Sequence, residues 1–167
     1  MPNRWPSVLA SLALIVGLDS GRAVAQSDTA RPAVWAQAGL GASTATLGGL
    51  VAASVVTGPH LVSARASFVA EHLDGGEDEA FDVALLYGRQ LRSRGAFRPS
   101  GAAGIAYVKC EGCDEGRNAS TVGLALSFEA ALWPTSVAGI GLHGFGNVNG
   151  IASFAGVALT LHVGRLR

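Results

Sequence analysis

The feature that most constrains this chain is a strict alternation of apolar side chains with small or polar ones. Between residues 120 and 133 every second side chain is apolar, from Val122 to Leu132, and the side chains between them are small or polar. This period of two fits a β-strand and does not fit a helix. The same alternation begins again at Val62 and at Val157. Each segment has about ten residues, which is long for a soluble sheet and matches a tilted membrane-spanning strand.

The N-terminus has the parts of a secretory signal peptide. Arg4 supplies the positive start, and the apolar segment 8–18 that follows is too short to span a bilayer as a helix. Small residues before position 26 form a cleavage site, so we expect cleavage between Ala25 and Gln26. The alternative is an uncleaved anchor, which the helix-breaking residues at 17–21 argue against. No later apolar run approaches the roughly 20 residues of a membrane-spanning helix, so a membrane domain of this chain would span as strands.

The composition indicates one exported domain and excludes nucleic-acid binding. Charged residues make up 14% of the 167 residues, below the roughly 25% of ordinary soluble domains, and 23 residues are glycine. Lys plus Arg and Asp plus Glu number 12 each, so the chain lacks the basic excess that nucleic-acid binding uses. We predict a signal peptide at 1–25, a short polar extension at 26–32 and one barrel domain at 33–167.

Turn-forming residues divide the predicted domain into about eight strands, the smallest number in transmembrane barrels. The predicted strands cover residues 33–46, 49–57, 60–72, 80–91, 97–109, 119–132, 137–147 and 152–165, with the first turn around 47–49. Short turns then lie on the side of both termini, and longer, acidic loops lie on the opposite side. An even number of strands lets the last strand pair with the first. We therefore predict an all-β fold, a closed antiparallel up-and-down transmembrane barrel without an open edge.

The two faces of the predicted strands indicate which side meets lipid. In a membrane the apolar face is directed outward, and a lumen ringed by about eight strands has room for small side chains and a few paired polar ones. Buried charges must be paired, so we predict a polar network in the lumen. Its members are Arg65, Glu129, His143 and His162, with Gln37 as a further candidate.

The aromatic side chains are expected near the two ends of the barrel, where membrane interfaces favour them. These residues are Tyr87 and Phe97 near the end with the termini, and Phe68, Phe81 and Tyr107 near the other end. Strict alternation turns Trp35 and Trp133 into the lumen, which predicts either bulged strand ends or a weak aromatic girdle there.

Cys110 and Cys113 form the C-x-x-C motif of the chain. In an exported protein a disulfide at the tip of an outer loop is favoured for this spacing. A zinc site would need two more ligands, and a redox motif would need a helix start in an α/β pattern. We therefore predict a disulfide between the two cysteines.

Two adjacent strands are predicted to bring together Ser127, His143 and Glu129. These residue types can act as a nucleophile, a base and an acid that orients the base. Such a hydrolase site would face a narrow lumen that an acyl chain could hardly enter, so we predict no catalytic residue, no cofactor and no metal.

Glu71 and Asp82 approach each other beside the acidic loop. Solvated acid is the favoured interpretation there, and a divalent-cation contact or surface recognition is the alternative.

From the signal peptide to the closing segment 154–165, FAGVALTLHVGR, the chain resembles the small, eight-stranded bacterial outer-membrane β-barrel family. It departs from that family at its C-terminus, where Leu166 and Arg167 replace the common terminal aromatic residue. The resemblance implies a location in the bacterial outer membrane, contact with its lipids, and a structural or surface-interaction role without enzymatic activity. A surface ligand would then bind at the outer loops. The alternatives are a soluble exported lipocalin-like barrel that binds a small apolar ligand, and a lipid-modifying outer-membrane hydrolase.

Overall fold

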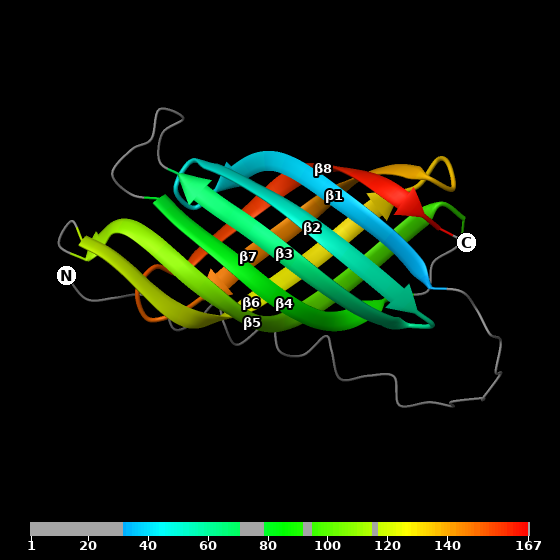
Figure 1. Ribbon diagram of the computed structural model, residues 1–167. Helices are drawn as coiled ribbons and strands as arrows, with labels where there is room; N and C mark the ends of the chain where they lie inside the picture. The colour runs from blue at the N-terminus through cyan, green and yellow to red at the C-terminus, as the bar shows by residue number, and fades with distance from the viewer. Residues whose placement is uncertain (1–31, 71–78, 92–94, 115–116, 167) are drawn as a thin grey trace, which may run out of the picture.

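Eight antiparallel strands form one sheet in the computed structural model of the protein (Figure 1). The structure describes residues 32–70, 79–91, 95–114 and 117–166, without the side chains of 112–114 and 117. The predicted signal peptide and nearly all of the predicted extension lie outside these residues. The strands are β1 (Ala33–Ser43), β2 (Leu47–Thr57), β3 (His60–Ala70), β4 (Glu79–Gln90), β5 (Phe97–Asp114), β6 (Arg117–Leu132), β7 (Ala138–Val148) and β8 (Phe154–Arg165). No helix in the described part of the chain is long and apolar enough to cross a membrane.

The sheet closes through the pairing of β1 with β8. Their register runs from Val34 opposite Arg165 to Ser43 opposite Gly156. All other pairs join strands that follow each other in the sequence, so each strand has a partner on both sides. The backbone groups in the middle of the barrel therefore face a neighbouring strand, and no edge is left open. The predicted closed antiparallel up-and-down barrel is confirmed.

The two ends of the barrel differ in their connections. We call the end at which β1 begins and β8 finishes the terminal end, and the opposite end the loop end; they lie to the right and to the left in Figure 1. The β2–β3, β4–β5 and β6–β7 connections lie at the terminal end. At the loop end β5 and β6 reach furthest from the barrel (Figure 1). Turns and loops are thus grouped as the sequence predicts.

The apolar face of the strands is the outer face of the barrel. Large apolar side chains such as Ile105, Val122 and Leu161 are at least 66% exposed. The alternate residues point into the lumen, where glycine, alanine and polar side chains predominate. This distribution is the one predicted for a barrel in a membrane. It is the reverse of a ligand-binding cup, which presents apolar residues inward and polar residues outward.

The predicted position of the first turn is wrong. β1 ends at Ser43 and β2 begins at Leu47, so the turn precedes the glycine pair Gly48 and Gly49. The Ser43 hydroxyl organises the turn: it accepts hydrogen bonds from the amides of residues 45 and 46, at 3.2 and 3.3 Å, and donates one to the Leu47 carbonyl at 2.7 Å. The two glycines belong to the strand, where the ring of Phe68 would be 2.5 Å from a Cβ on Gly49. The glycine pair therefore makes room for aromatic rings, not for a turn.

The β5–β6 hairpin is longer than predicted. β5 extends to Asp114, beyond the expected end at residue 109, and β6 starts at Arg117. The pairing continues past Cys110, which lies opposite Ala119, with a shift of register before Asp114. A two-stranded ladder needs no third strand to continue, so the hairpin runs past the point where its neighbours end.

Closure of the β1–β8 seam depends on Gly41. A Cβ at this position would overlap the carbonyl oxygen of Val157 on β8. We expect Gly41→Val to destabilise the barrel by about 2–3 kcal/mol or to prevent closure, because the strand backbones must separate. Urea unfolding of the purified protein measures the effect. Gly144→Val is the matched control, because a Cβ there would have its nearest neighbour at 3.8 Å; equal losses in both variants would contradict the prediction.

Candidate functional site: the polar lumen

The half of the lumen nearer the loop end is organised around Asp82. Its carboxylate lies 2.8 Å from the Arg65 guanidinium, and both side chains are fully buried. Ser67 donates a hydrogen bond to one carboxylate oxygen, and Asn147 donates one to the other at 3.0 Å. Arg65 also donates to the Leu126 carbonyl at 2.7 Å, and it lies over the ring of Phe145. The ion pair is therefore compensated by further hydrogen bonds, as a buried pair requires.

The interpretation of Asp82 as part of an acidic outer surface is wrong. Its side chain points into the lumen, on the same face of β4 as Ala80 and Ala84. The sequence contained the signal, because Asp82 alternates with the outward-facing Phe81 and Val83. Glu71, the other carboxylate of that interpretation, lies outside the described residues.

The half of the lumen nearer the terminal end holds the other predicted residues. Glu129 lies 3.6 Å from Nδ1 of His143 and 3.8 Å from Nδ1 of His162. Gln37 Nε2 is 2.9 Å from His143 Nδ1. The Thr160 hydroxyl is 2.9 Å from His162 Nε2 and donates a hydrogen bond to the Gly141 carbonyl at 3.1 Å. The four residues predicted as one network thus divide into two groups: Arg65 pairs with Asp82, and the two histidines share Glu129.

Two tryptophans cover this half of the lumen at the terminal end. Trp35 and Trp133 both point inward, with their ring centroids 6.1 Å apart in an edge-to-face arrangement. Trp133 also contacts the His162 ring, at a centroid distance of 5.5 Å. Val56, Leu61 and Ala131 complete the apolar cluster. The tryptophans therefore close the lumen and do not belong to an outer aromatic girdle.

Ser127, His143 and Glu129 are brought together, but their hydrogen bonds differ from those of an activated serine. Ser127 Oγ lies 2.5 Å from His143 Nε2. Because Gln37 donates its amide hydrogen to Nδ1, the neutral imidazole carries its proton on Nε2 and donates to Ser127. A general base would instead need a free lone pair on Nε2. All three side chains are also buried in the lumen, on the side of the sheet that faces away from the apolar exterior.

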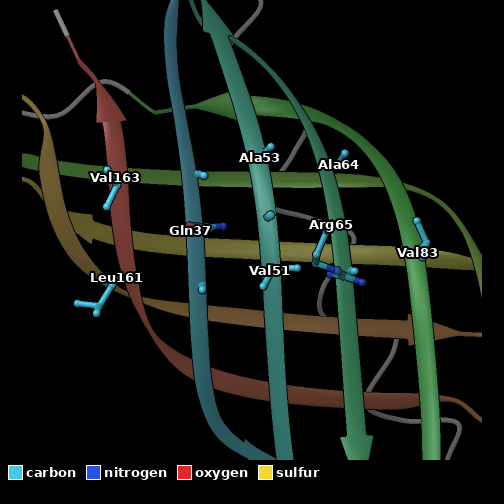
Figure 2. A pocket seen from close by; sticks show the side chains of 12 residues that line it. Gln37, Val51, Ala53, Ala64, Arg65, Val83, Leu161 and Val163 are labelled. Carbon is cyan, nitrogen blue, oxygen red and sulfur yellow. The ribbon is translucent and has the colours of Figure 1, made fainter.

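A shallow apolar hollow lies on the outer surface, across the strands from β8 to β4. Figure 2 shows Val51, Ala53 and Ala64 on its floor, between Leu161 and Val163 on one side and Val83 on the other. Alanines at 36, 38 and 66 complete the floor. The hollow lies where small outward-facing side chains meet on β1, β2 and β3, and the two polar residues that line it, Gln37 and Arg65, are buried.

The loop end carries the exposed charges of β5. Lys109 Nζ lies 2.7 Å from Glu111 Oε1, and this hydrogen bond, with the negative charge of Glu111, raises the pKa of Lys109. An exposed pair of this kind contributes little to stability.

Cys110 is buried, whereas the Cys113 side chain lies outside the described part, so the disulfide stays a prediction. Among the described residues no group of three or more His, Cys, Asp or Glu side chains could hold a metal ion.

Solved structures with a similar fold are small membrane barrels. Neisserial surface protein A is 8% identical, with a TM-score of 0.61 over 79% of this chain and 96% of that one. The N-terminal β-barrel domain of Pseudomonas aeruginosa OprF is 14% identical, with a TM-score of 0.51 over 78% and 96%. A de novo designed transmembrane β-barrel is 11% identical, with a TM-score of 0.51 over 79% and 94%. At these identities the likeness shows the fold alone. No protein-family model and no curated protein matches the chain.

The Arg65–Asp82 pair offers a test of the lumen packing. We expect Arg65→Met or Asp82→Leu alone to cost about 3–5 kcal/mol, because each leaves one buried charge without a partner. The double variant should cost less than either single variant, since no charge then remains. Urea unfolding of all four proteins gives the double-mutant cycle. If the loss of unfolding free energy in the double variant equals the sum of the two single losses, the Arg65 and Asp82 charges do not stabilise each other.

Proposed function

We propose that the protein is a bacterial outer-membrane β-barrel with a structural or surface-interaction role and a plugged lumen, and that it is not an enzyme. The observation that carries this proposal is the apolar exterior of a closed sheet. A soluble protein rarely exposes a large continuous apolar surface. In a bilayer the same surface contacts acyl chains, while the closed sheet satisfies the backbone groups.

The distribution of charge along the outer face supports a membrane band. Outward-facing basic side chains lie at the terminal end: His60, Arg89 and Arg165. Lys109 and Glu111 lie outward near the loop end. Between these two zones, no outward-facing side chain of the described strands is charged. The exposed rings of Tyr87 and Phe97 toward the terminal end, and of Phe81 and Tyr107 toward the loop end, flank the band as interfacial aromatic residues do.

The filled lumen supports a role that does not depend on transport or catalysis. Two polar groups and an apolar tryptophan cluster occupy it, and the buried Arg65 and Asp82 side chains form an ion pair. The Gln37 contact favours the imidazole tautomer that does not activate Ser127. The surface left for a partner is the loop end, where the β5–β6 hairpin extends beyond the barrel (Figure 1). Neisserial surface protein A, with the same fold, is named for a surface location.

Export and loop chemistry belong to the same proposal. Cleavage between Ala25 and Gln26 would release a mature chain that begins six residues before residue 32, where the described structure starts. A Cys110–Cys113 disulfide would brace the β5–β6 hairpin in the oxidising space that an exported protein enters. Outer-membrane lipids are then the partners of the exterior, and a ligand of the loop end would be a surface ligand.

The membrane assignment is tested by placing a charge in the apolar band. Leu159 is 64% exposed near the middle of β8. In a bilayer, Leu159→Arg should cost about 2–4 kcal/mol of folding free energy in lipid vesicles. On the surface of a soluble barrel the same change would stay within about 0.5 kcal/mol.

Val148→Arg is the matched control, because Val148 is an exposed residue at the loop end of β7. We expect it to cost about 0–1 kcal/mol, since the cost of a charge falls toward the membrane interface. The processed wild-type protein should also sediment with membranes and migrate faster on SDS gels before boiling than after. Recovery in periplasmic fluid without detergent, together with equal stability of both arginine variants, would overturn the proposal.

A further inference from the structure

The outer hollow is a depression in the apolar face of β1, β2 and β3. One row of the sheet joins Ala36, Ala53 and Ala64 across these three strands. Larger side chains end this row on both sides, Val163 on β8 and Leu85 on β4. The hollow above the alanines has a volume of about 660 Å³ (Figure 2). In a bilayer, apolar groups from outside must fill it, because empty space would leave the alanines without van der Waals contacts.

A polar cluster lies on the outer face of β3 and β4 at the terminal end. His60 and Arg89 lie directly opposite each other in the register of these strands. The Tyr87 hydroxyl is 2.7 Å from Nδ1 of His60, and the two rings stack with their centroids 6.0 Å apart. All three side chains are exposed. The cluster therefore places one permanent positive charge and two polar rings at the edge of the apolar exterior.

Arg89 forms no ion pair with any side chain that the structure describes. The described acidic side chains lie in the lumen or near the loop end: Glu79, Asp82, Glu111 and Glu129. A guanidinium keeps its charge at every pH that a folded protein meets, and its parallel N–H donors match the oxygens of a phosphate. An anionic group at the membrane interface is therefore complementary to this position.

His60 and Tyr87 offer a hydrogen-bond donor in either tautomer of the imidazole. The neutral pair has two such hydrogens, one on the ring and one on the phenol, and their contact uses one of them. If the phenol donates to Nδ1, the hydrogen on Nε2 is left. If Nδ1 donates to the phenol oxygen, the phenol hydrogen is left. One donor thus remains beside the Arg89 charge for an acceptor outside the protein.

We propose that the outer face of β2, β3 and β4 binds one anionic phospholipid from the leaflet at the terminal end. Its phosphate contacts Arg89, His60 and Tyr87, and an acyl chain lies in the hollow. This inference rests on the proposed membrane role and names the class of lipid that the exterior selects. Basic sites at a membrane surface attract acidic lipids in the same way.

The spacing of the cluster and the hollow fits such a lipid. His60 and Ala64 lie four residues apart on the outer face of β3, which corresponds to about 13 Å along the strand. Between them Val62 lies opposite Val55, and both are exposed apolar side chains. The path from the cluster to the hollow is therefore apolar, as the path from a headgroup to the chains of a phospholipid is.

The charges favour an acidic headgroup over a zwitterionic one. A zwitterionic lipid carries a cation beyond its phosphate, and this cation would need an anionic partner on the protein. The described outer face at the terminal end presents basic side chains and no acidic one. An acidic lipid such as phosphatidylglycerol has only the phosphate charge, which Arg89 can neutralise.

Native mass spectrometry of the full processed protein in detergent tests the headgroup. Phosphatidylglycerol and phosphatidylcholine with the same acyl chains are added at equal concentrations. The wild type should bind the first phosphatidylglycerol about fivefold more tightly, the contribution expected of one basic side chain. Arg89→Gln should remove this preference. Arg98→Gln is the matched control and should keep it, because the Arg98 guanidinium at the same end donates to the Gly95 carbonyl.

The same measurement tests the hollow with a substitution that leaves every charge in place. Ala64→Leu adds a larger side chain to the floor, so we expect about threefold weaker binding of the first phosphatidylglycerol as contacts with the acyl chain are lost. Ala130→Leu is the matched control, because Ala130 is exposed on the outer face of β6 and does not line the hollow. It should bind as the wild type does.

The outcomes separate this site from the proposed membrane role. Equal binding of the two lipids by the wild type, which requires no variant to fold, would overturn the site, while the membrane role is tested independently by Leu159→Arg. An Arg89→Gln variant with the wild-type preference would also overturn it, as would an Ala64→Leu variant with wild-type affinity. A dimer without lipid would assign the hollow to a second copy of the chain and would equally overturn the proposal.

Discussion

The structure depends on the pairing of β1 with β8. A sheet in hydrocarbon cannot leave backbone amides and carbonyls without partners, because no water is there to replace them. The in-phase ends of an even number of strands allow this last pair to form, and glycines at the seam allow it to approach closely. Closure then fixes which face is outside, and the alternation of the sequence places the apolar side chains there.

A closed barrel of this size leaves a lumen that must be filled by its own side chains. Alanines and glycines supply most of the inner surface, and the remaining volume holds two polar groups of different character. The Arg65–Asp82 group is balanced by its own charges and hydrogen bonds. In the Glu129 group the carboxylate lies 3.6 Å from Nδ1 of His143 and 3.8 Å from Nδ1 of His162.

Much of the candidate site could be predicted from alternation alone. The pattern placed Arg65, Glu129, His143 and His162 on the inward face, because a period of two assigns each residue to a side before any pairing is known. The pattern did not identify partners. Charge alone groups Asp82 with the acidic loop, although its place in β4 turns it inward, and its contact with Arg65 follows from the offset between two neighbouring strands.

The sequence by itself determined the strand period, the up-and-down order and the separation of apolar from small and polar faces, because these depend on neighbours along the chain. Only the tertiary structure decided the first turn, the length of the β5–β6 hairpin and the division of the lumen into two groups. These depend on contacts between distant residues: Phe68 over Gly49, and Gln37 of β1 against His143 of β7. Such contacts exist only after the sheet has closed, when strands from opposite ends of the sequence face each other across the lumen.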